Sequence, residues 1–425
     1  MRIGIIIGRI GDVDGVALET EKWIEVLKRM GHEIFILSGR FKRSIVGEDH
    51  ETLIPGLSFF SPECEWEQNR AFFFPPDEPS ELLDHLHRVS DGLAIRMFKW
   101  MMQNKIDIIL SENASALPAH LTMGMAIKKL VDNTGIPIVC HDHDFSWERG
   151  KRYYTPFPEV EQIINETFPM QIPHAKHAVI NTYARNFLKD NFNIPSIVVP
   201  NVMDFDKPYG VKDDYNSDLL KCIGLNNNNI VLFQITRIVK RKGIETALEL
   251  IDRLDDKNIK LVVTGSAADD DRKGYYRELI NIIKKRKLED QVLFAHHRIL
   301  NDRGTTHDGK KIYSLSDAYA HATACTYFST YEGFGNAFVE AVLAKTPIFV
   351  NNYKPVFWLD IGSKGFKVVM IEESKLTDEA VAEVDKIIHN KKLQTEIGEF
   401  NYNLGKLLFS YDVLQEKLEI LFSSL

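Results

Sequence analysis

One stretch limits the folds open to this chain more than any other: residues 324–352, which read ACTYFSTYEGFGNAFVEAVLAKTPIFVNN. It opens with a short apolar run, passes through a glycine-bearing turn, continues with apolar residues at helical spacing, and closes on the strand-like segment TPIFV. This order predicts a strand, a turn, a helix and a second strand. Units of this kind build an α/β fold with a parallel sheet.

The turn of this unit has the chemistry of a phosphate site. Gly333 and Gly335 let the backbone approach a ligand closely, and the amides up to Ala337 lie where the helix begins, with unpaired N–H groups and the positive end of the helix dipole. Glu332 in the turn and Glu340 in the helix flank it, and Glu340 can accept hydrogen bonds from a diol such as a ribose. Taken alone, either glutamate is more simply explained as a loop charge or a dipole-stabilised carboxylate.

The chain is organised in two halves that share an alternation of strands and helices. Its 425 residues exceed one ordinary core and predict two domains of roughly 200 residues each. The first half opens with the apolar run RIGIIIG, a strand of the type found in parallel sheets covered on both faces. The second half restarts with IVLFQIT after the turn NNNN at 226–229. We predict two Rossmann-like β/α/β domains over 1–205 and 206–405, and a helix within 406–425.

Composition excludes several classes of function. The net charge of −8 argues against nucleic acid as the main partner, because a phosphate backbone demands a basic face. No run of about 18 apolar residues is present to span a membrane, and the first apolar run is too short for a secretion signal. The four cysteines form neither metal-ligand pairs nor a disulfide framework. These features predict a cytoplasmic protein; peripheral membrane contact and the oligomeric state stay open.

Further candidate residues follow predicted strands, where open α/β sheets bind ligands. Asn113 follows the strand IDIIL, and a loop with helix-capping residues explains it equally well. Arg237 and Lys242 follow the strand IVLFQIT and precede a helix. This pair can grip a diphosphate, since arginine clamps two oxygens and lysine supplies a point charge. The alternative for the pair is a solvated basic loop.

The segment HDHD at 141–144 follows another predicted strand. Alternate residues leaving a strand point to opposite sides, so His141 and His143 share one side while the aspartates share the other, and we predict no bound metal. The loop that follows is charged and aromatic, with Trp147 and Arg149 among its residues. We predict that this loop closes over an acceptor and that its basic side suits an anionic one.

These motifs resemble those of the retaining glycosyltransferases of family 4, also called glycosyl transferase group 1, which have the GT-B fold. Glu332 and Glu340 match the E-x7-E signature, and Arg237 and Lys242 match its R-x4-K pair. The family also has a Gly-Gly-Val loop at the position of Gly15, although the first of the two glycines is Asp14 here. The resemblance covers nearly the whole chain.

The resemblance implies a role for each matched position. A histidine six residues after the proline that starts a strand corresponds to His143 and implies contact with the transferred sugar. It implies that five residues bind the donor: Gly15, Gly335, Asn336, Ala337 and Glu340. It implies that four residues take part in catalysis: His143, Arg237, Lys242 and Glu332. Three acceptor-side candidates come from composition and position: Asn113, Trp147 and Arg149.

The same resemblance implies the overall architecture and the reaction. The two domains face each other across a cleft, with the acceptor on the side of 1–205, the nucleotide sugar in 206–405, and the helix of 406–425 packed back on the first domain. A hexose moves from a nucleoside diphosphate sugar, of the GDP-mannose or UDP-glucose type, to a small polar or anionic acceptor. Neither a metal nor a cofactor is required, and the configuration is retained. A GT-B glycoside phosphorylase and a non-catalytic nucleotide-sugar-binding protein are the alternatives.

Overall fold

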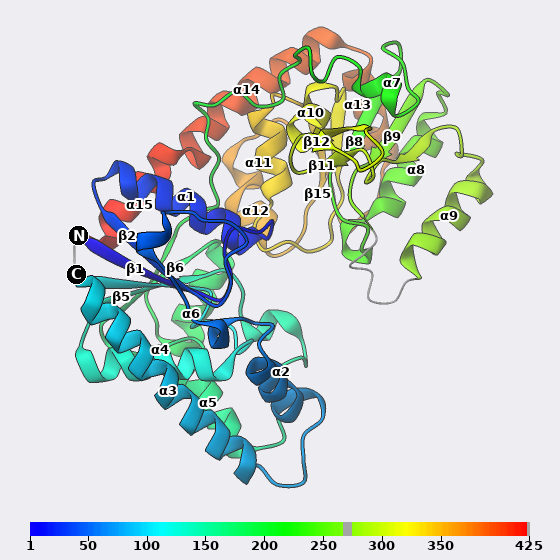
Figure 1. The fold of residues 1–425 in the computed structure, drawn as a ribbon. Coiled ribbons are helices and arrows are strands. Elements are labelled where there is room, and N and C mark those ends of the chain that lie inside the picture. The colour runs from blue at the N-terminus through cyan, green and yellow to red at the C-terminus, as the bar shows by residue number, and fades with distance from the viewer. Residues whose placement is uncertain (267–273, 423–425) are drawn as a thin grey trace. The chain divides into compact units, whose positions relative to one another are not determined.

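The computed structural model describes residues 1–266 and 274–422 (Figure 1). The chain divides into two compact units: Met1–Asn201 together with Tyr411–Leu425, and Val202–Ser410. The sequence-based boundaries lie at 205 and 405. Each unit has its own parallel sheet and its own apolar core. The prediction of two α/β units is confirmed.

The first unit is built on a seven-stranded sheet in the order β3-β2-β1-β4-β5-β6-β7. All neighbouring strands are parallel, and the order of strands along the chain reverses between β1 and β4. The strands are β1 (Arg2–Ile7), β2 (Glu33–Ser38), β3 (Glu51–Leu53), β4 (Ile108–Glu112), β5 (Ile138–Asp142), β6 (Ala175–Val179) and β7 (Ser196–Val198). Every residue of β4 and β5 is buried, as expected of central strands covered on both faces.

The helices of the first unit are α1 (Gly15–Arg29), α2 (Pro62–Gln68), α3 (Ser80–Asn104), α4 (Leu121–Thr134), α5 (Pro158–Thr167), α6 (Thr182–Phe192) and α15 (Tyr411–Phe422). Helix α1 begins at Gly15 because the carboxylate of Asp14 accepts a hydrogen bond from the amide of Ala17 at 3.0 Å. The same carboxylate pairs with Arg9 at 3.0 Å. The aspartate that replaces a family glycine is therefore the cap of this helix.

The last helix, α15, packs against α1 of the first unit (Figure 1). Its residues Leu414, Leu418 and Leu421 are buried at the spacing of one helix face. Arg29 of α1 lies over the ring of Tyr411 at 5.1 Å. The predicted helix extended to residue 425, and its last three residues lie outside the described part of the chain.

The second unit is built on a six-stranded parallel sheet in the order β10-β9-β8-β14-β15-β16. Its strands are β8 (Ile230–Gln234), β9 (Ile259–Val263), β10 (Val292–Phe294), β14 (Ala324–Tyr327), β15 (Ile348–Asn351) and β16 (Val369–Ile371). A separate small sheet joins β11 (Ile299–Leu300), β13 (Lys311–Ser314) and β12 (Gly304–Thr305). The strand order of the main sheet reverses between β8 and β14.

The helices of the second unit are α7 (Leu219–Cys222), α8 (Ile244–Leu254), α9 (Tyr275–Arg286), α10 (Leu315–Ala320), α11 (Asn336–Leu343), α12 (Val356–Asp360), α13 (Asp378–Ile388) and α14 (Lys391–Phe409). Helix α8 illustrates why they pack on the sheet: Ile244, Ala247, Leu248 and Ile251 recur at helical spacing and all are buried in the core. The stretch 324–352 forms β14, α11 and β15, as predicted. Within the described residues, no helix combines the length and the apolar character needed to cross a membrane.

Candidate functional site

The candidate site of the second unit lies after β8 and β14, where the strand order reverses and open α/β sheets bind their ligands. A buried glutamine of β8 joins the loop that leaves β8 to the strand β14. The side chain of Gln234 donates to the carbonyl of Lys242 at 2.9 Å and accepts from the hydroxyl of Thr326 at 3.0 Å. The amide of Thr330 donates to the carbonyl of Arg241 at 2.8 Å. Two segments about 90 residues apart in sequence are thereby held as one surface.

Glu332 lies between two cations on this surface. Its carboxylate forms an ion pair with Lys242 and accepts from Arg241 at 2.9 Å, and Arg241 also donates to the carbonyl of Tyr331 at 2.9 Å. Lys242 is the last residue of a short helical turn, Lys240–Lys242, which precedes α8. The sequence predicted Lys242 and Glu332 as site residues but missed Arg241, which looked like part of a solvated basic run.

The charges of this cluster do not balance. Burial lowers the pKa of Lys242, and the neighbouring charges of Arg241 and Arg237 lower it further against the opposing effect of Glu332. Burial alone would raise the pKa of Glu332, but Lys242 and Arg241 outweigh it and the pKa is lowered. An anion is thus favoured here and another cation disfavoured, because the cations outnumber the carboxylate. Arg237, exposed beyond the end of β8, is near enough for its charge to act on Lys242.

The turn before α11 requires its glycine. Gly335 has φ 139°, and a Cβ atom there would lie 2.2 Å from the hydroxyl oxygen of Tyr353. That hydroxyl is fixed because it donates to the carbonyl of Phe334 at 2.6 Å. Asn336 and Ala337 form the first turn of α11, so their amides lie at the positive end of its dipole. The turn therefore depends on Gly335, and its binding of phosphate stays a prediction.

Glu340 lies on the same helix, one turn further on. The hydroxyl of Tyr319, on α10, is within hydrogen-bond distance of both the carboxylate of Glu340 (3.2 Å) and the carbonyl of Ala337 (3.1 Å). Burial raises the pKa of Tyr319 well above its usual value, and the charge of Glu340 adds to this effect. Tyr319 is therefore a neutral hydroxyl that orients Glu340.

A second cluster of chemistry-bearing side chains lies in the first unit. His141 Nδ1 is 3.0 Å from Glu112 Oε2 and 3.2 Å from Oε1, and His143 Nε2 is 3.6 Å from Oε2. Trp23 stacks on His141 with ring centroids 3.9 Å apart. The predicted sharing of one side by His141 and His143 is confirmed, since Asp142 instead pairs with a different histidine. The sequence did not predict Glu112.

The acceptor-side candidates make contacts of their own. Asn113 accepts hydrogen bonds from the amides of His143 (3.0 Å) and Asp144 (3.1 Å), so it holds the backbone that carries His143. The ring of Trp147 stacks on three phenylalanines, with centroids 4.4 Å, 4.2 Å and 5.5 Å away. Arg149 pairs with Asp144 at 2.6 Å. Their contact with an acceptor stays a prediction, as does the donor contact of Gly15.

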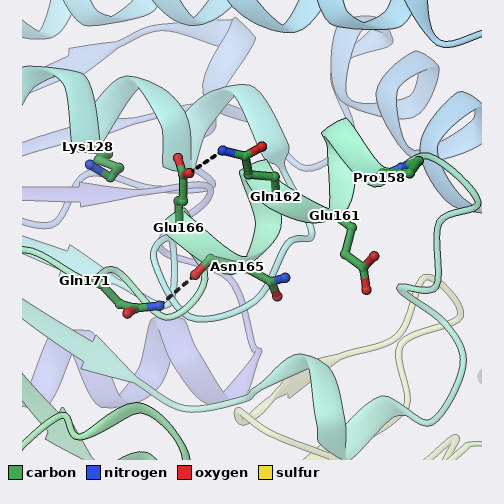
Figure 2. A pocket seen from close by; sticks show the side chains of 7 residues that line it. All are labelled: Lys128, Pro158, Glu161, Gln162, Asn165, Glu166 and Gln171. Carbon is green, nitrogen blue, oxygen red and sulfur yellow. Dashed lines mark hydrogen bonds between the residues drawn. The ribbon is translucent and has the colours of Figure 1, made fainter.

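A polar hollow of about 580 Å³ lies elsewhere on the first unit (Figure 2). Its lining comes from α4, α5 and the segment after α5, namely Lys128, Pro158, Glu161, Gln162, Asn165, Glu166 and Gln171. Figure 2 shows two hydrogen bonds within this set: Gln162 to Glu166 at 2.8 Å and Gln171 to the carbonyl of Asn165 at 2.7 Å. None of the predicted site residues lines this hollow.

Comparisons with known proteins agree on a family. The model of the family described as "Glycosyl transferases group 1" matches residues 218–404. Mannosylglucosylglycerate synthase of Petrotoga mobilis is 30% identical over 398 residues, which are 87% of this chain and 86% of that protein. The enzyme of the same name from Thermotoga maritima is 30% identical over 441 residues, 98% of this chain and 99% of that one.

Solved structures show the same fold. A glycosyltransferase from Rickettsia africae has a TM-score of 0.69 at 16% identity and covers 99% of this chain, with 97% of its own length matched. HepE of Anabaena, solved in complex with UDP, has a TM-score of 0.65 at 14% identity, and each chain covers 100% of the other. These likenesses confirm the predicted GT-B fold.

Proposed function

The chain belongs to the group 1 glycosyltransferases of GT-B fold, and from this we propose that it is a retaining enzyme that transfers a hexose from a nucleoside diphosphate sugar to a small anionic acceptor. The excess of positive charge around Glu332 is the observation that carries the proposal. Two cations contact one carboxylate, and a third, Arg237, lowers the pKa of Lys242. An added diphosphate would neutralise that excess.

The chemistry follows from these charges. Breaking the bond from the anomeric carbon to the diphosphate places negative charge on the leaving oxygen. Lys242, Arg237 and the amides at the start of α11 are fixed donors for that charge, and donors aimed at developing charge are usually a large part of catalysis. In this proposal the departing phosphate oxygen takes the proton of the acceptor hydroxyl, on the face that it leaves. Neither a metal nor a cofactor takes part in the transfer.

Glu332 and Glu340 have separate tasks in the proposal. Glu332 keeps Lys242 charged within a buried environment and faces the reactive end of the donor. Glu340, oriented by Tyr319, accepts hydrogen bonds from the ribose hydroxyls. The helix that carries Glu340 also supplies the amides for the diphosphate. One short helix thus binds two parts of the nucleotide.

The acceptor proposed is a glycoside of glycerate. The two relatives are named for a mannosylglucosylglycerate product, which contains a glycerate carboxylate, and this supports mannose as the transferred sugar. The basic loop around Arg149 supplies positive charge in the first unit. The pair of Arg149 with Asp144 is partly exposed, and exposed pairs are weak, so a substrate carboxylate can replace Asp144.

Product analysis tests the proposal. The purified chain is incubated with GDP-mannose or UDP-glucose and with glucosylglycerate, and products are identified by mass spectrometry and NMR. We expect one new α-glycosidic bond with a GDP-mannose donor and no reaction with inorganic phosphate. Glycoside cleavage that requires phosphate would instead indicate a phosphorylase. Nucleotide binding without turnover on any acceptor would indicate a non-catalytic protein.

Arg237→Ala tests the diphosphate clamp within this reaction. We expect turnover to fall by about two orders of magnitude or more, as when a single oxyanion donor is removed, with an unchanged circular dichroism spectrum. Lys240→Met is the control, because Lys240 is a cation of the same loop whose partners are Glu245 and Glu278. Equal activity of Arg237→Ala and Lys240→Met would show that Arg237 does not act on the diphosphate.

A further inference from the structure

Glu112 and His141 have no task in the proposed transfer, although they lie beside His143, the predicted sugar-contacting residue. All three side chains are almost fully buried, with 0%, 1% and 6% of the side chain exposed. Their ligand atoms all lie within 4.8 Å of one another. Two imidazoles and a carboxylate that converge in this way form a donor set for a divalent metal ion.

The sheet itself brings these side chains together. Glu112 at the end of β4 is the register partner of His141 on the neighbouring strand β5. Partners in register place their side chains on the same face, and His143 returns to that face two residues later. The rings of His141 and His143 are 4.1 Å apart. The ends of β4 and β5 therefore fix Glu112 and His141, and Asn113 holds the backbone of His143 just after β5.

One atom of the cluster lacks a hydrogen-bond partner. His143 Nε2 is buried and has none among the described residues, and Glu112 Oε2 lies 3.6 Å from it, beyond hydrogen-bond distance. Leaving a buried polar atom without a partner is costly. Four ligands at about 2.0–2.1 Å from a tetrahedral ion lie about 3.3 Å from one another. Glu112 Oε2 is 3.0 Å from His141 Nδ1 and 3.6 Å from His143 Nε2, on either side of that value.

The surroundings favour a cation over an empty site. Glu19, on α1, is a further buried carboxylate, and its charge acts on both histidines. Lys22 pairs with Glu19, and Asp144, whose charge also acts on His143, pairs with Arg149, so three carboxylates face two permanent cations around the histidines. Trp23 of the same helix stacks on His141 and fixes its ring. Such outer partners hold metal-ligating histidines in place.

We infer that Glu112, His141 and His143 bind a divalent transition-metal ion, with Zn²⁺ as the best fit to two imidazoles and one carboxylate. The fourth position is open to water or an anion. The residues that carry this inference all lie in the first unit, and none of the observations behind it depends on the proposed transfer. A bound ion takes up His143 Nε2, so on the proposed function it also inhibits transfer.

Metal titration of the whole chain tests the inference. The purified protein is stripped with EDTA and titrated with Co²⁺, whose visible d–d bands report tetrahedral coordination, and Zn²⁺ is then added as a competitor. We expect one tightly bound ion per chain, displaced by Zn²⁺, and affinity lowered by more than about tenfold in Glu112→Gln. Glu67→Gln is the matched control, because Glu67 is another buried carboxylate beside histidines, and should bind as the wild type does.

A second measurement keeps the inference testable if Glu112→Gln does not fold. Hydrogen exchange of the wild type with and without Zn²⁺ should show added protection in peptides at the ends of β4 and β5. Absence of a stoichiometric ion, protection elsewhere, or unchanged affinity in a folded Glu112→Gln variant would each overturn the assignment. Neither measurement uses sugar transfer, so a failed transfer assay leaves this result unaffected.

Discussion

Lys242 and Glu332 form an ion pair, but the excess of positive charge around Glu332 predicts that their separate substitution has unequal effects on stability. Glu332→Gln leaves Lys242 and Arg241 beside each other without an anion. Lys242→Met leaves a one-to-one pair of Arg241 and Glu332. The substitution of the carboxylate should therefore destabilise the second unit more than the substitution of the lysine, although both break the same contact.

The magnitude follows from burial. Lys242 and Glu332 each have side chains only 11% exposed, and removing one partner of a buried pair costs about 3–5 kcal/mol. We expect that full cost for Glu332→Gln. For Lys242→Met we expect about 1–2 kcal/mol, because Arg241 still compensates the carboxylate. Lys240→Met, at a side chain 68% exposed, should cost less than about 1 kcal/mol.

For diphosphate affinity the order of the two variants should be reversed: Lys242→Met should have the larger effect and Glu332→Gln the smaller. Glu332→Gln increases the positive charge of the site, so UDP or GDP should bind at least as tightly as to the wild type. Lys242→Met removes a charge that faces the phosphates and should weaken binding by about tenfold or more, equivalent to about 1.4 kcal/mol. Isothermal titration calorimetry measures this affinity, and Lys240→Met should leave it unchanged.

Urea unfolding followed by hydrogen exchange in peptides from β8 and β14 measures the stability of the second unit by itself. This readout is needed because a chain of two units need not unfold in one step. A greater loss of stability in Lys242→Met than in Glu332→Gln would refute the charge argument. Weaker diphosphate binding in Glu332→Gln than in Lys242→Met would refute it as well.

Two further predictions concern packing and pH. Gly335→Ala forces a Cβ to 2.2 Å from the hydroxyl of Tyr353 and should cost more than about 2 kcal/mol in urea unfolding, whereas Gly304→Ala, where a Cβ meets nothing within 4 Å, should cost under about 0.5 kcal/mol. Burial would raise the pKa of Glu67, but hydrogen bonds that include one with His120 lower it from 4.5 to about 2. Its stabilisation, about 3 kcal/mol, is thus present above pH 4.5 and lost as pH falls toward 2. Urea midpoints across this range should fall more steeply for the wild type than for Glu67→Gln; equal slopes would contradict the assignment.

Local patterns were sufficient for the central unit of the fold. The stretch 324–352 carries its glycine turn, its helical spacing and its closing strand within 29 residues, and β14, α11 and β15 form there. By contrast, α2 lies in a segment of the sequence whose apolar residues show no regular spacing. The signals for its start were present, since Ser61 caps it and Pro62 is its first residue, but its seven residues are too few for a clear apolar repeat.

The contacts of the site were less predictable than its residues. Lys242 and Glu332 were each predicted, but their pairing depends on β8 and β14 being neighbours, which no local pattern specifies. Glu112 was missed for the same reason. Its role arises only from the register of β4 with β5, which places it opposite His141. Strand order thus determines which predicted residues meet.

A crystal structure of the protein with an intact nucleoside diphosphate sugar tests the central claim most directly. The account predicts that the diphosphate contacts Lys242, Arg237 and the amide of Ala337, and that the ribose hydroxyls donate to Glu340. A donor bound elsewhere, with Lys242 still paired only to Glu332 and the start of α11 facing solvent, would contradict it.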